Sequence, residues 1–405
     1  MKLLLSCDDF LYSHQGEYYA SSQEKFDFYQ RYLRVFDKLR LVCRCEEKDQ
    51  LKASYVCLSK DSRIEVVSVP MFHGPKQYMK KYLSVGISIK NIVKDCDAAV
   101  LRIPSTIAMR IGKQVMKSNL PYACEVVYDG EDGWKVTTGI TRLLWKNIDR
   151  KMRKLCKLAD GVSCVTERYL QQHYYSEIPH AFTSHYSSLA LNKDFYTSPK
   201  SYPNHRPIVI AHVTNQIGYR KRKGNLELIK AISILKGFGI DARVKFVGEI
   251  RDNSPEKVKK FASQFGVEDS IEFLGYINRK ELDDFLNNVD LFVLPTKAEG
   301  LPRVIIEAMA KGLPTITTPV SGCPELISEH FLVDYDNVQG LAERIKELVE
   351  NPQLYVQTSK ENFDKSWQYE ASVLEKRRDE FYMKLRNVAA NRNRKTDYSY
   401  DNRHF

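Results

Sequence analysis

Two glutamates eight residues apart, Glu299 and Glu307, lie in the stretch of sequence with the clearest chemical potential. Residues 294–316 read LPTKAEGLPRVIIEAMAKGLPTI. Glu307 lies in an otherwise apolar run, where an unpaired carboxylate is costly to bury. Sugar hydroxyls are suitable partners, because a carboxylate accepts two hydrogen bonds from a vicinal diol. Pairing with an internal arginine, or capping of a backbone group, is the alternative, and the residues alone leave both open.

A helix N-terminus is predicted beside Glu299. Pro302 suits the first turn of a helix, and Gly312 suits the position that ends it. Because a buried strand ends near Pro295, this N-terminus would lie at the carboxyl edge of a sheet. Free backbone N–H groups and the helix dipole favour an anion there.

A run of cations forms a second candidate site, in the segment GYRKRKGN (218–225) between a predicted strand and a predicted helix. The cations are Arg220, Lys221, Arg222 and Lys223. Cations beside a helix N-terminus form phosphate sites, although a solvated basic loop would look the same. Lys223 is the first choice for a phosphate contact, since it adjoins Gly224 and the helix start.

A third segment, VSGCPELI (320–327), follows a predicted strand. Gly322 permits a close backbone approach, and Glu325 could orient the loop. The signal is weak by itself, and an ordinary surface turn is the alternative.

Short apolar, β-branched runs alternate with helical patterns along the whole chain, which predicts parallel sheets with crossover helices. We predict strands at residues 2–7, 39–45, 64–69, 98–103, 122–128, 161–166, 207–214, 243–249, 271–276, 290–296, 314–319 and 331–335. Helices are predicted at 22–37, 78–95, 105–118, 138–158, 224–237, 255–265, 279–288, 302–311, 337–350 and about 370–386.

The expected fold class is α/β, with two Rossmann-like doubly wound domains that face each other across a cleft. Ligands of such sheets bind at the carboxyl ends of the strands. Residues 1–200 would form an acceptor-binding domain and residues 201–370 a donor-binding domain. The polar string 198–207 is the predicted linker. Residues 371–405 would form a helix that packs back on the first domain, followed from residue 386 by a polar tail.

The composition limits the class of protein. The chain has 405 residues, 43% of them hydrophobic and 28% charged, which excludes bulk disorder. The start MKLLLSCDDF does not resemble a signal peptide, and no stretch approaches the ~20 apolar residues of a membrane span. Nine scattered cysteines, with Cys43 and Cys45 as the only close pair, indicate reduced and mostly buried thiols. We therefore expect a cytoplasmic protein.

The net charge of +11 allows nucleic acid, an anionic membrane or a phosphorylated small molecule as partner. Residues 1–200 carry +9 and residues 201–250 carry +6, whereas residues 251–350 carry −7. No nucleic-acid-binding motif is recognised, so nucleic acid is the least favoured of the three.

The motifs in their order and spacing resemble those of the retaining glycosyltransferases of family 4, which have the GT-B fold. The matching segments are KAEGLPRVIIEAMAKGLPTI, the following SGCPELI, the KG pair at 223–224, and EFLGY between them. The pair of glutamates with seven residues between them is the hallmark of that family. The resemblance is strong over about 207–350 and weaker before it.

The resemblance implies roles for individual residues. Glu299 would contact the donor sugar, Glu307 would hold the ribose, and Lys223 would bind the diphosphate. The remaining donor-site candidates are main-chain or neighbouring groups of this site: Gly300, Leu301, Pro302, Gly248, Glu249, Gly322, and Tyr276 near the base. No cofactor and no metal are implied, and the nucleoside-diphosphate sugar is a co-substrate.

Two positions depart from the family pattern. Gly218 stands where the family often has an arginine, so Arg220 is the candidate for the second phosphate contact. Ser321 stands where the family often has the first of two glycines, and its hydroxyl could still donate a hydrogen bond.

The first half offers weaker candidates for the acceptor or a phosphate loop. The segment 8–19 follows the first strand, where the family often has a glycine-bearing loop, so Gly16 and His14 are candidates. Three more candidates, Arg102, Glu125 and Asp129, come near the ends of strands. For each of these, an ordinary structural role is the alternative.

The amphipathic stretch 141–160 carries seven Lys or Arg against two Asp. Its apolar stripe is expected to lie in the core, and it comprises Leu143, Leu144, Ile148, Met152 and Leu155. The basic face could touch anionic lipid or a lipid-linked diphosphate. The D-x-D pattern at 95–97 precedes a strand, so it would face away from the site, and we do not expect it to bind metal.

These observations predict a retaining, metal-independent glycosyltransferase that acts in surface polysaccharide biosynthesis. It would move a sugar from a nucleoside diphosphate to a glycan or a polyprenyl-diphosphate-linked acceptor. We expect it in the cytoplasm, with possible peripheral contact at the inner face of the plasma membrane. A nucleotide-sugar epimerase of the same fold is the alternative, followed by a basic nucleic-acid-binding protein.

Overall fold

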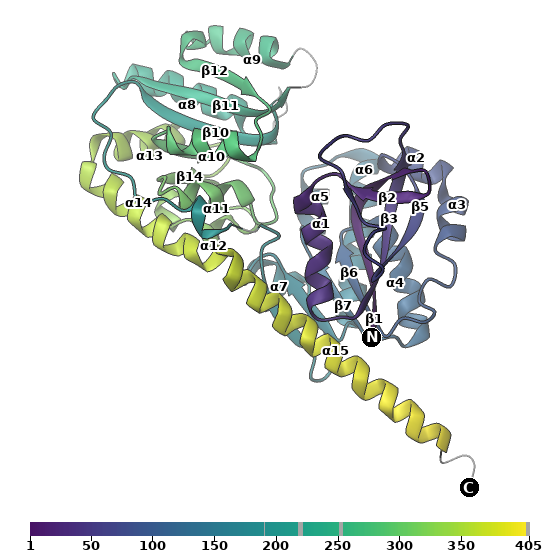
Figure 1. The fold of residues 1–405 in the computed structure, drawn as a ribbon. Helices are drawn as coiled ribbons and strands as arrows, with labels where there is room; N and C mark the ends of the chain where they lie inside the picture. The colour runs from purple at the N-terminus through teal and green to yellow at the C-terminus, as the bar shows by residue number, and fades with distance from the viewer. Residues whose placement is uncertain (190, 218–221, 251–253, 402–405) are drawn as a thin grey trace. The chain divides into compact units, whose positions relative to one another are not determined.

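The computed structural model describes residues 1–189, 191–217, 222–250 and 254–401, with side chains except at 254 and 393–401. The chain forms two compact units. The first unit consists of residues 1–130, 143–186 and 375–405, and the second of residues 131–142 and 187–374. Each unit is built on a sheet with parallel strands, which confirms the predicted α/β class (Figure 1).

The sheet of the first unit has nine strands within the described residues. They are β1 (Lys2–His14), β2 (Glu17–Ala20), β3 (Lys38–Glu47), β4 (Val56–Cys57), β5 (Ile64–Pro70), β6 (Ala98–Ile103), β7 (Tyr122–Val126), β8 (Gly161–Cys164) and β9 (Phe182–His185). Seven run parallel in the order β5-β3-β1-β6-β7-β8-β9. All six strands predicted in this half are present, whereas β2, β4 and β9 were not predicted.

The segment after the first strand was expected to be a loop, and this expectation was wrong. β1 continues through an irregularity between Ser6 and Phe10 and reaches His14. Gln15 and Gly16 then form a two-residue turn with positive φ at both positions, and β2 returns antiparallel. Such a turn is the tight connection that suits the twist of a hairpin. Gly16 therefore lies at the tip of a β-hairpin.

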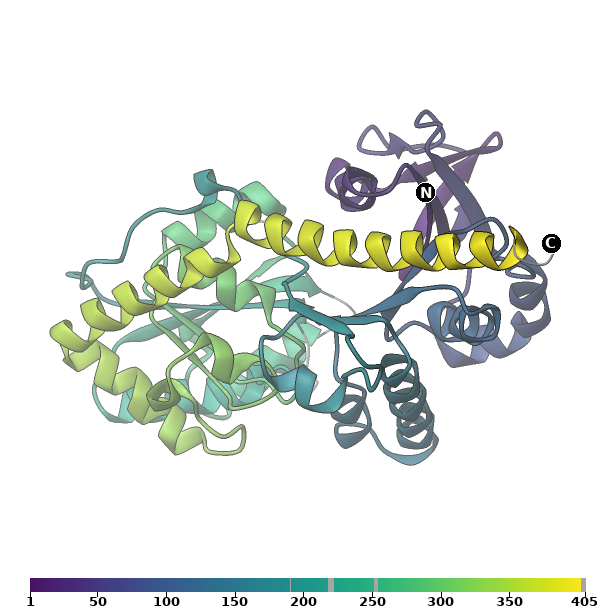
Figure 2. The same ribbon diagram turned by 90° about the horizontal axis from the view of Figure 1, so that it is seen from below.

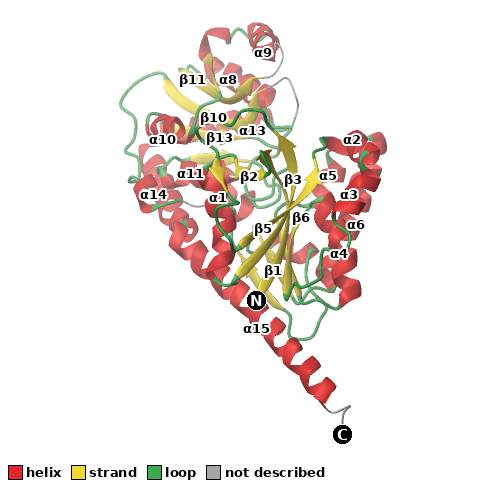
Figure 3. Cartoon of the chain, turned by 45° about the vertical axis from the view of Figure 1, so that its right-hand side comes forward, coloured by secondary structure: helices red, strands yellow, loops and turns green. Residues whose placement is uncertain are grey.

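Helices cover both faces of this sheet, as Figure 3 shows. They are α1 (Gln23–Gln30) with the short 3-10 helix η1 (Arg31–Arg34), α2 (Gly74–Lys80), α3 (Tyr82–Ser88), α4 (Thr106–Ser118), α5 (Gly130–Lys135), α6 (Gly139–Lys157) and α7 (Tyr169–His173). The single helix predicted at 78–95 is thus two short ones. α5 and the first residues of α6 are grouped with the second unit.

The apolar stripe of α6 only partly confirms the prediction that it lies in the core. Met152 and Leu155 are buried, whereas Leu143 is 66% exposed and Leu144 is 39% exposed. Only the second half of α6 packs its apolar side against the first unit, since the helix begins in the segment that is grouped with the second unit.

The C-terminal helix α15 (Ala371–Asp401) is much longer than predicted. A polar tail was expected from residue 386, but the helix continues to Asp401. Arg386 binds Asp37, and Arg392 binds Asp160, both in the first unit. These ion pairs link the helix to the first unit as far as Arg392. Figure 2 shows α15 in yellow.

The second unit has five parallel strands within the described residues, in the order β12-β11-β10-β13-β14. They are β10 (Ile208–Ile217), β11 (Ala242–Ile250), β12 (Ile271–Gly275), β13 (Leu291–Leu294) and β14 (Thr315–Thr317). The strand predicted at 331–335 is absent. A single bridge joins Thr317 to Leu332, and the chain then turns, with the amide of Asn337 donating to the carbonyl of Asp334 over 2.9 Å.

The helices of the second unit are α8 (Asn225–Gly237), α9 (Ser254–Ser263), α10 (Arg279–Asn287), α11 (Arg303–Ala310), α12 (Cys323–Leu326), α13 (Val338–Glu350) and α14 (Pro352–Ser366), with the 3-10 helices η2 (Lys193–Phe195), η3 (Glu268–Ser270), η4 (Glu329–Phe331) and η5 (Trp367–Tyr369). α8 packs beside α13, and α11 packs beside α14 (Figure 1). α14 was not predicted, although Asn351 caps it and Pro352 opens it.

All nine cysteines lie in the described part of the chain and are free thiols. Seven are buried, and Cys57 and Cys96 are partly exposed, as the scattered pattern predicted. Among the described helices, none has a segment of the length and apolarity that crossing a bilayer requires.

Candidate functional site

The predicted donor-site residues come together at the carboxyl edge of the sheet in the second unit. Because the described strands of this sheet are parallel, the segments that follow them meet at one edge. Each strand contributes one segment: Lys223 after β10, Gly248 and Glu249 at the end of β11, Tyr276 after β12, Glu299 to Pro302 after β13, and Gly322 after β14.

The two residues expected to do most of the chemistry are in direct contact. Lys223 Nζ donates to Glu299 Oε1, and the side chains are 29% and 13% exposed. Next to this pair, the amide of Lys297 donates to the carbonyl of Arg222 over 2.9 Å. The segments after β10 and β13 are therefore held together by both main chain and side chain.

Gly224 allows this close approach. It has φ of +74° and forms the N-cap of α8. A Cβ atom at this position would lie 1.9 Å from the carbonyl oxygen of Pro295. No other residue fits, so the KG pair recognised in the sequence has a steric reason in this structure.

A buried histidine on β10, His212, contacts the first residue of α8. His212 on β10 contacts the carbonyl of Val293 over 2.9 Å and the side chain of Asn225 over 2.8 Å. Burial lowers the pKa of His212 to about 4, although both hydrogen bonds act in the opposite direction. The ring is therefore neutral at pH 7 and links β10, β13 and the helix that follows Lys223.

Ser321 joins the glutamate segment to another part of the second unit. Its Oγ donates to the carboxylate of Asp132 and accepts from the amide of Glu299 over 3.4 Å. The amide of Gly322 donates to the carbonyl of Gly300 over 2.9 Å. The hydroxyl at this departure from the family pattern thus makes hydrogen bonds that a glycine could not make.

Ser321 adopts a left-handed backbone conformation, with φ of +50°. A glycine would take this conformation without strain, which accounts for glycine at this place in the family pattern. Asp132 was not among the predicted site residues, because its partner lies 189 residues away in the chain.

Glu307 is paired with an arginine that the sequence analysis did not identify. Arg279 Nη1 donates to Glu307 Oε1, and the carboxylate side chain is 8% exposed. Arg279 is 47% exposed at the first turn of α10, and its guanidinium lies 4.6 Å from the ring centre of Phe195. The internal arginine considered as an alternative is therefore present, and it reaches Glu307 from the solvent side.

The remaining predicted residues of the second unit differ in exposure. Tyr276 is 76% exposed directly after β12, and Glu249 is exposed at the end of β11. Leu301 and Pro302 are buried, and Pro302 is the N-cap of α11. Arg220 lies outside the described residues.

In the first unit, Glu125 and Arg102 form the centre of a buried polar cluster. Glu125 is 2% exposed and accepts hydrogen bonds from four side chains: Arg102 at 2.8 Å, Tyr32 at 3.0 Å, Tyr186 at 3.0 Å, and Tyr382 of α15. Burial by itself raises the pKa of Glu125, but Arg102 and Arg31 outweigh it and lower the pKa to about 2.

The other candidates of the first unit do not join this cluster. Asp129 is buried and accepts from Tyr174 at 2.9 Å, and it contacts His173 at 3.1 Å. His14 Nδ1 contacts the carbonyl of Lys48 at 2.8 Å at the end of β1. Asp129 and His14 thus each have hydrogen-bond partners other than Glu125.

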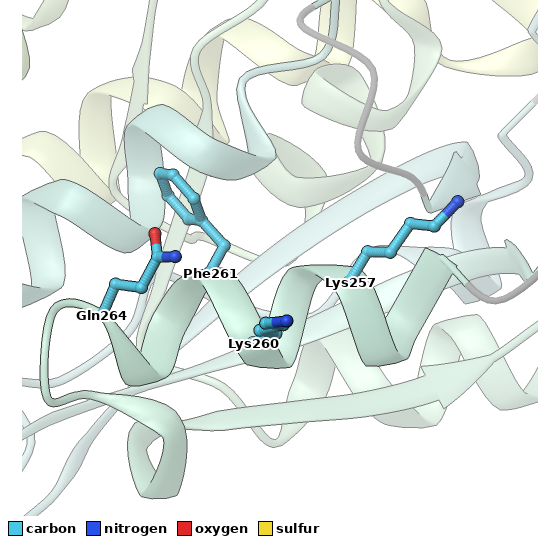
Figure 4. Close-up of a pocket in the computed structure, with 4 residues that line it drawn as sticks. All are labelled: Lys257, Lys260, Phe261 and Gln264. Atoms are coloured by element: carbon cyan, nitrogen blue, oxygen red, sulfur yellow. The ribbon is translucent and has the colours of Figure 1, made fainter.

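A shallow hollow of about 260 Å³ runs along α9 (Figure 4). It is lined by Lys257, Lys260, Phe261 and Gln264, none of which is a predicted site residue. In the part of the chain that the structure describes, no three His, Cys, Asp or Glu side chains are grouped as a metal site would require. In the D-x-D pattern, Asp97 accepts a hydrogen bond from the amide of Lys2 over 2.6 Å.

Several solved structures share this fold. Sucrose-phosphate synthase from Thermosynechococcus elongatus has a TM-score of 0.70 and 16% identity, over 96% of this chain and 99% of its own. HepE from Anabaena, solved in complex with UDP, has a TM-score of 0.64 and 15% identity, over 94% and 99%. The two parallel sheets therefore form the predicted GT-B fold.

The family follows from the sequence comparisons. The family model of glycosyl transferases group 1 matches residues 204–365, which contain every described donor-site candidate. Protein CapJ of Staphylococcus aureus is 23% identical over 361 residues, 89% of each chain. Residues 204–365 therefore match the family of the glycosyl transferases group 1, as the motifs predicted.

Two further relatives match over a shorter part. The putative colanic acid biosynthesis glycosyltransferase WcaL of Salmonella typhimurium is 32% identical over 31% of this chain and 33% of its own. The N,N'-diacetylbacillosaminyl-diphospho-undecaprenol alpha-1,3-N-acetylgalactosaminyltransferase of Campylobacter jejuni is 29% identical over 40% and 41%.

Proposed function

We propose that this glycosyltransferase takes its sugar from a nucleoside diphosphate and binds that donor at the carboxyl edge of the second sheet. The observation that carries the proposal is the contact between Lys223 and Glu299, which joins a cation to a carboxylate at the start of one helix and before another. A diphosphate needs the cation, and sugar hydroxyls need the carboxylate. The two groups that would bind the diphosphate and the sugar of the donor are thus side by side.

The donor would rearrange this ion pair when it binds. Lys223 would turn from Glu299 to a phosphate oxygen, and Glu299 would then accept hydrogen bonds from the sugar. Neither group would be left unpaired, so the exchange avoids the cost of a buried lone charge. Arg220 is proposed as a second phosphate contact.

The reaction breaks the bond between the anomeric carbon and the diphosphate oxygen, and it forms a bond from that carbon to the acceptor hydroxyl. Negative charge grows on the leaving diphosphate, and Lys223 stabilises it most at that stage. In a retaining transfer on one face of the sugar, the leaving phosphate oxygen takes the proton of the acceptor hydroxyl. We propose that no metal ion is needed, and activity in the presence of a chelator tests this point.

The nucleoside would be bound by Glu307 and Tyr276. We propose that the ribose diol replaces Arg279 on Glu307, because Arg279 is half-exposed and can swing into solvent while Glu307 cannot. The exposed ring of Tyr276 offers a surface for the base. UDP is the first nucleotide to test, since the HepE structure contains it.

The acceptor is proposed to be a glycan or a polyprenyl-diphosphate-linked sugar in surface polysaccharide biosynthesis. The names of WcaL and of the Campylobacter jejuni transferase support colanic acid-like products and undecaprenol-linked acceptors. We propose residues 1–200 as the acceptor-binding part and the donor site in residues 201–370. Gly16, His14, Arg102, Glu125 and Asp129 stay candidates for the acceptor side. A charged nucleotide sugar does not cross a bilayer, so we place the reaction on the cytoplasmic side of the plasma membrane.

Calorimetric titration with UDP and GDP tests the donor site. We expect Glu307→Ala to weaken binding of the preferred nucleotide roughly 10- to 100-fold, the loss of a charge-assisted bidentate contact. The matched control is Arg279→Ala, which breaks the same ion pair but leaves the carboxylate for the ribose. It should keep the affinity within about threefold. An equal loss of nucleotide affinity in both variants would show that binding depends on the ion pair and not on a contact between Glu307 and the ribose.

A further inference from the structure

Helices α2 and α3 carry three large apolar side chains that are mostly exposed to solvent. Met79 is 70% exposed, Leu83 is 78% exposed and Ile87 is 75% exposed. They are spaced four residues apart across the two helices, so they lie along one side and form what we call the apolar ridge. Exposed apolar side chains that are grouped in this way mark an interaction surface.

The ridge belongs to an ordered element and not to a frayed loop. On the inward side of α3, Val85 and Ile89 are completely or almost completely buried. From α4, Arg110 donates to the carbonyl of Tyr82 and lies 4.1 Å over its ring, and Gln114 donates to the carbonyl of Ile89 over 2.8 Å. α3 also packs along β5. Figures 1 and 3 show α2 and α3 on the opposite side of the first unit from α1.

The segment that contains the ridge carries only positive charge up to Lys94, after which Asp95 and Asp97 follow. Residues 71–94 contain five lysines and neither aspartate nor glutamate, and all five are exposed: Lys76, Lys80, Lys81, Lys90 and Lys94. Lys81 is tied to the carbonyl of Met71. The segment therefore presents three apolar side chains within a field of about five positive charges.

We propose that the apolar ridge and its lysines dock the protein on an anionic lipid bilayer. The apolar side chains would enter the interface between headgroups and acyl chains, and the lysines would contact anionic headgroups. The half-exposed Tyr82 would lie at headgroup depth, where aromatic rings with a polar end are favoured. A second copy of the chain is a poor occupant, because it would bring another five positive charges to the same surface.

This inference extends the proposed function, since a lipid-linked acceptor would be met at a bilayer, but its observations are independent of the donor site. From the sequence, the basic face of residues 141–160 was considered for such a contact, with other parts of the first domain equally possible, and the ridge is one of those other parts. The ridge lies wholly in the first unit, far along the chain from the motifs that define the family.

Co-sedimentation of the full chain with vesicles tests the proposal. The probes are vesicles of phosphatidylcholine with about 30% phosphatidylglycerol and vesicles of phosphatidylcholine alone. We expect the wild type to bind the anionic vesicles at least tenfold more tightly, and more weakly as salt rises. The triple variant Met79→Ser/Leu83→Ser/Ile87→Ser should lose at least tenfold in partitioning, as should Lys76→Gln/Lys80→Gln/Lys90→Gln.

The matched control is Phe238→Ser/Val356→Ser/Met383→Ser, which changes three exposed apolar residues elsewhere. It should bind the vesicles like the wild type. Failure of the wild type to bind anionic vesicles, or equal binding by the ridge variant, would overturn the proposal. So would a dimer, measured by light scattering, that the ridge variant alone abolishes. UDP titration of the same variants separates this test from the proposed function, because the ridge variant should keep its nucleotide affinity.

Discussion

At the scale of residues, the site depends on side chains that hold one another until the donor replaces them. Lys223 neutralises Glu299, and Arg279 neutralises Glu307. Each carboxylate is largely buried and each cation is more exposed than its partner. The cations are therefore the groups that can move when a ligand arrives, and the carboxylates are the fixed part of the site.

Lys223→Ala removes the cation that would stabilise the leaving diphosphate. We expect kcat to fall roughly 100- to 1,000-fold, as for other groups that act on developing charge. Thermal stability should also fall, because Glu299 is only 13% exposed and loses its ion-pair partner. Steady-state kinetics and a melting curve check the two halves of this prediction. Lys259→Ala, on the exposed side of α9, is the charge-matched control; full turnover by Lys223→Ala would remove the phosphate role.

Ser321 combines an unfavourable backbone conformation with a useful hydroxyl. Ser321→Ala keeps the strain and loses the hydrogen bonds to Asp132 and Glu299, whereas Ser321→Gly loses the bonds but relieves the strain. We expect the glycine variant to be more stable than the alanine variant by about 1 kcal/mol. Chemical unfolding of both variants measures the difference. If the alanine variant is the more stable of the two, the left-handed backbone conformation at this position causes no strain.

At the scale of elements, the site is made by strand ends that must approach closely. Gly224→Ala places a Cβ atom 1.9 Å from the carbonyl of Pro295, so the segments after β10 and β13 must separate. We expect a loss of stability of about 1–3 kcal/mol from the clash and the positive φ. Turnover should fall as well, because Lys223 moves with Gly224. Gly237→Ala, near the end of α8 with open space at its Cβ, is the control; similar behaviour of the two variants would contradict the steric account.

Sequence patterns identified the elements and motifs that depend on neighbours in the chain. The strand ends and the helix limits at Pro302 and Gly312 have local causes, whereas the KG pair was recognised from the family pattern. Arg279 and Asp132 could not be found in this way, because their partners lie 28 and 189 residues away. Only the packed sheet brings them together.

Two other elements that were not predicted, the first hairpin and α14, do have a recognisable signal in the sequence. Positive φ at Gln15 and Gly16 makes a tight turn, and a glycine between two apolar, aromatic runs is typical of a hairpin. Asn351 followed by Pro352 marks the start of α14. The extension of α15 to Asp401 had no such signal, and ion pairs with Asp37 and Asp160 link it to the first unit as far as Arg392.

At the scale of the whole molecule, Glu125 ties the C-terminal helix to the first unit. Tyr382 of α15 shares this carboxylate with Arg102, Tyr32 and Tyr186. The chain therefore closes the fold of its first half with residues from its far end. Truncation before α15 would leave this cluster incomplete.

The pKa of Glu125 makes this contact dependent on pH. The folded pKa of about 2 lies below the ordinary value of 4.5, so the charged form stabilises the fold. This stabilisation is fully present above about pH 4.5 and is lost as the pH falls toward 2. A shift of this size corresponds to about 3 kcal/mol. Chemical unfolding at pH 7 and at pH 3 measures the free energy of unfolding of the wild type and of Glu125→Gln. The difference between the two proteins should be about 2 kcal/mol smaller at pH 3 than at pH 7. A difference that stays constant would contradict a charged Glu125 in the folded protein.

The family model that matches residues 204–365 is one of enzymes that transfer a sugar. The released nucleoside diphosphate, measured across a set of donors with a polyprenyl-diphosphate-linked acceptor present and absent, is the most direct test of this activity. One donor should release its nucleoside diphosphate in step with glycosylation of the acceptor, and only slowly without it. A donor converted to an isomeric nucleotide sugar in the absence of acceptor would instead identify an epimerase and contradict the proposed transfer.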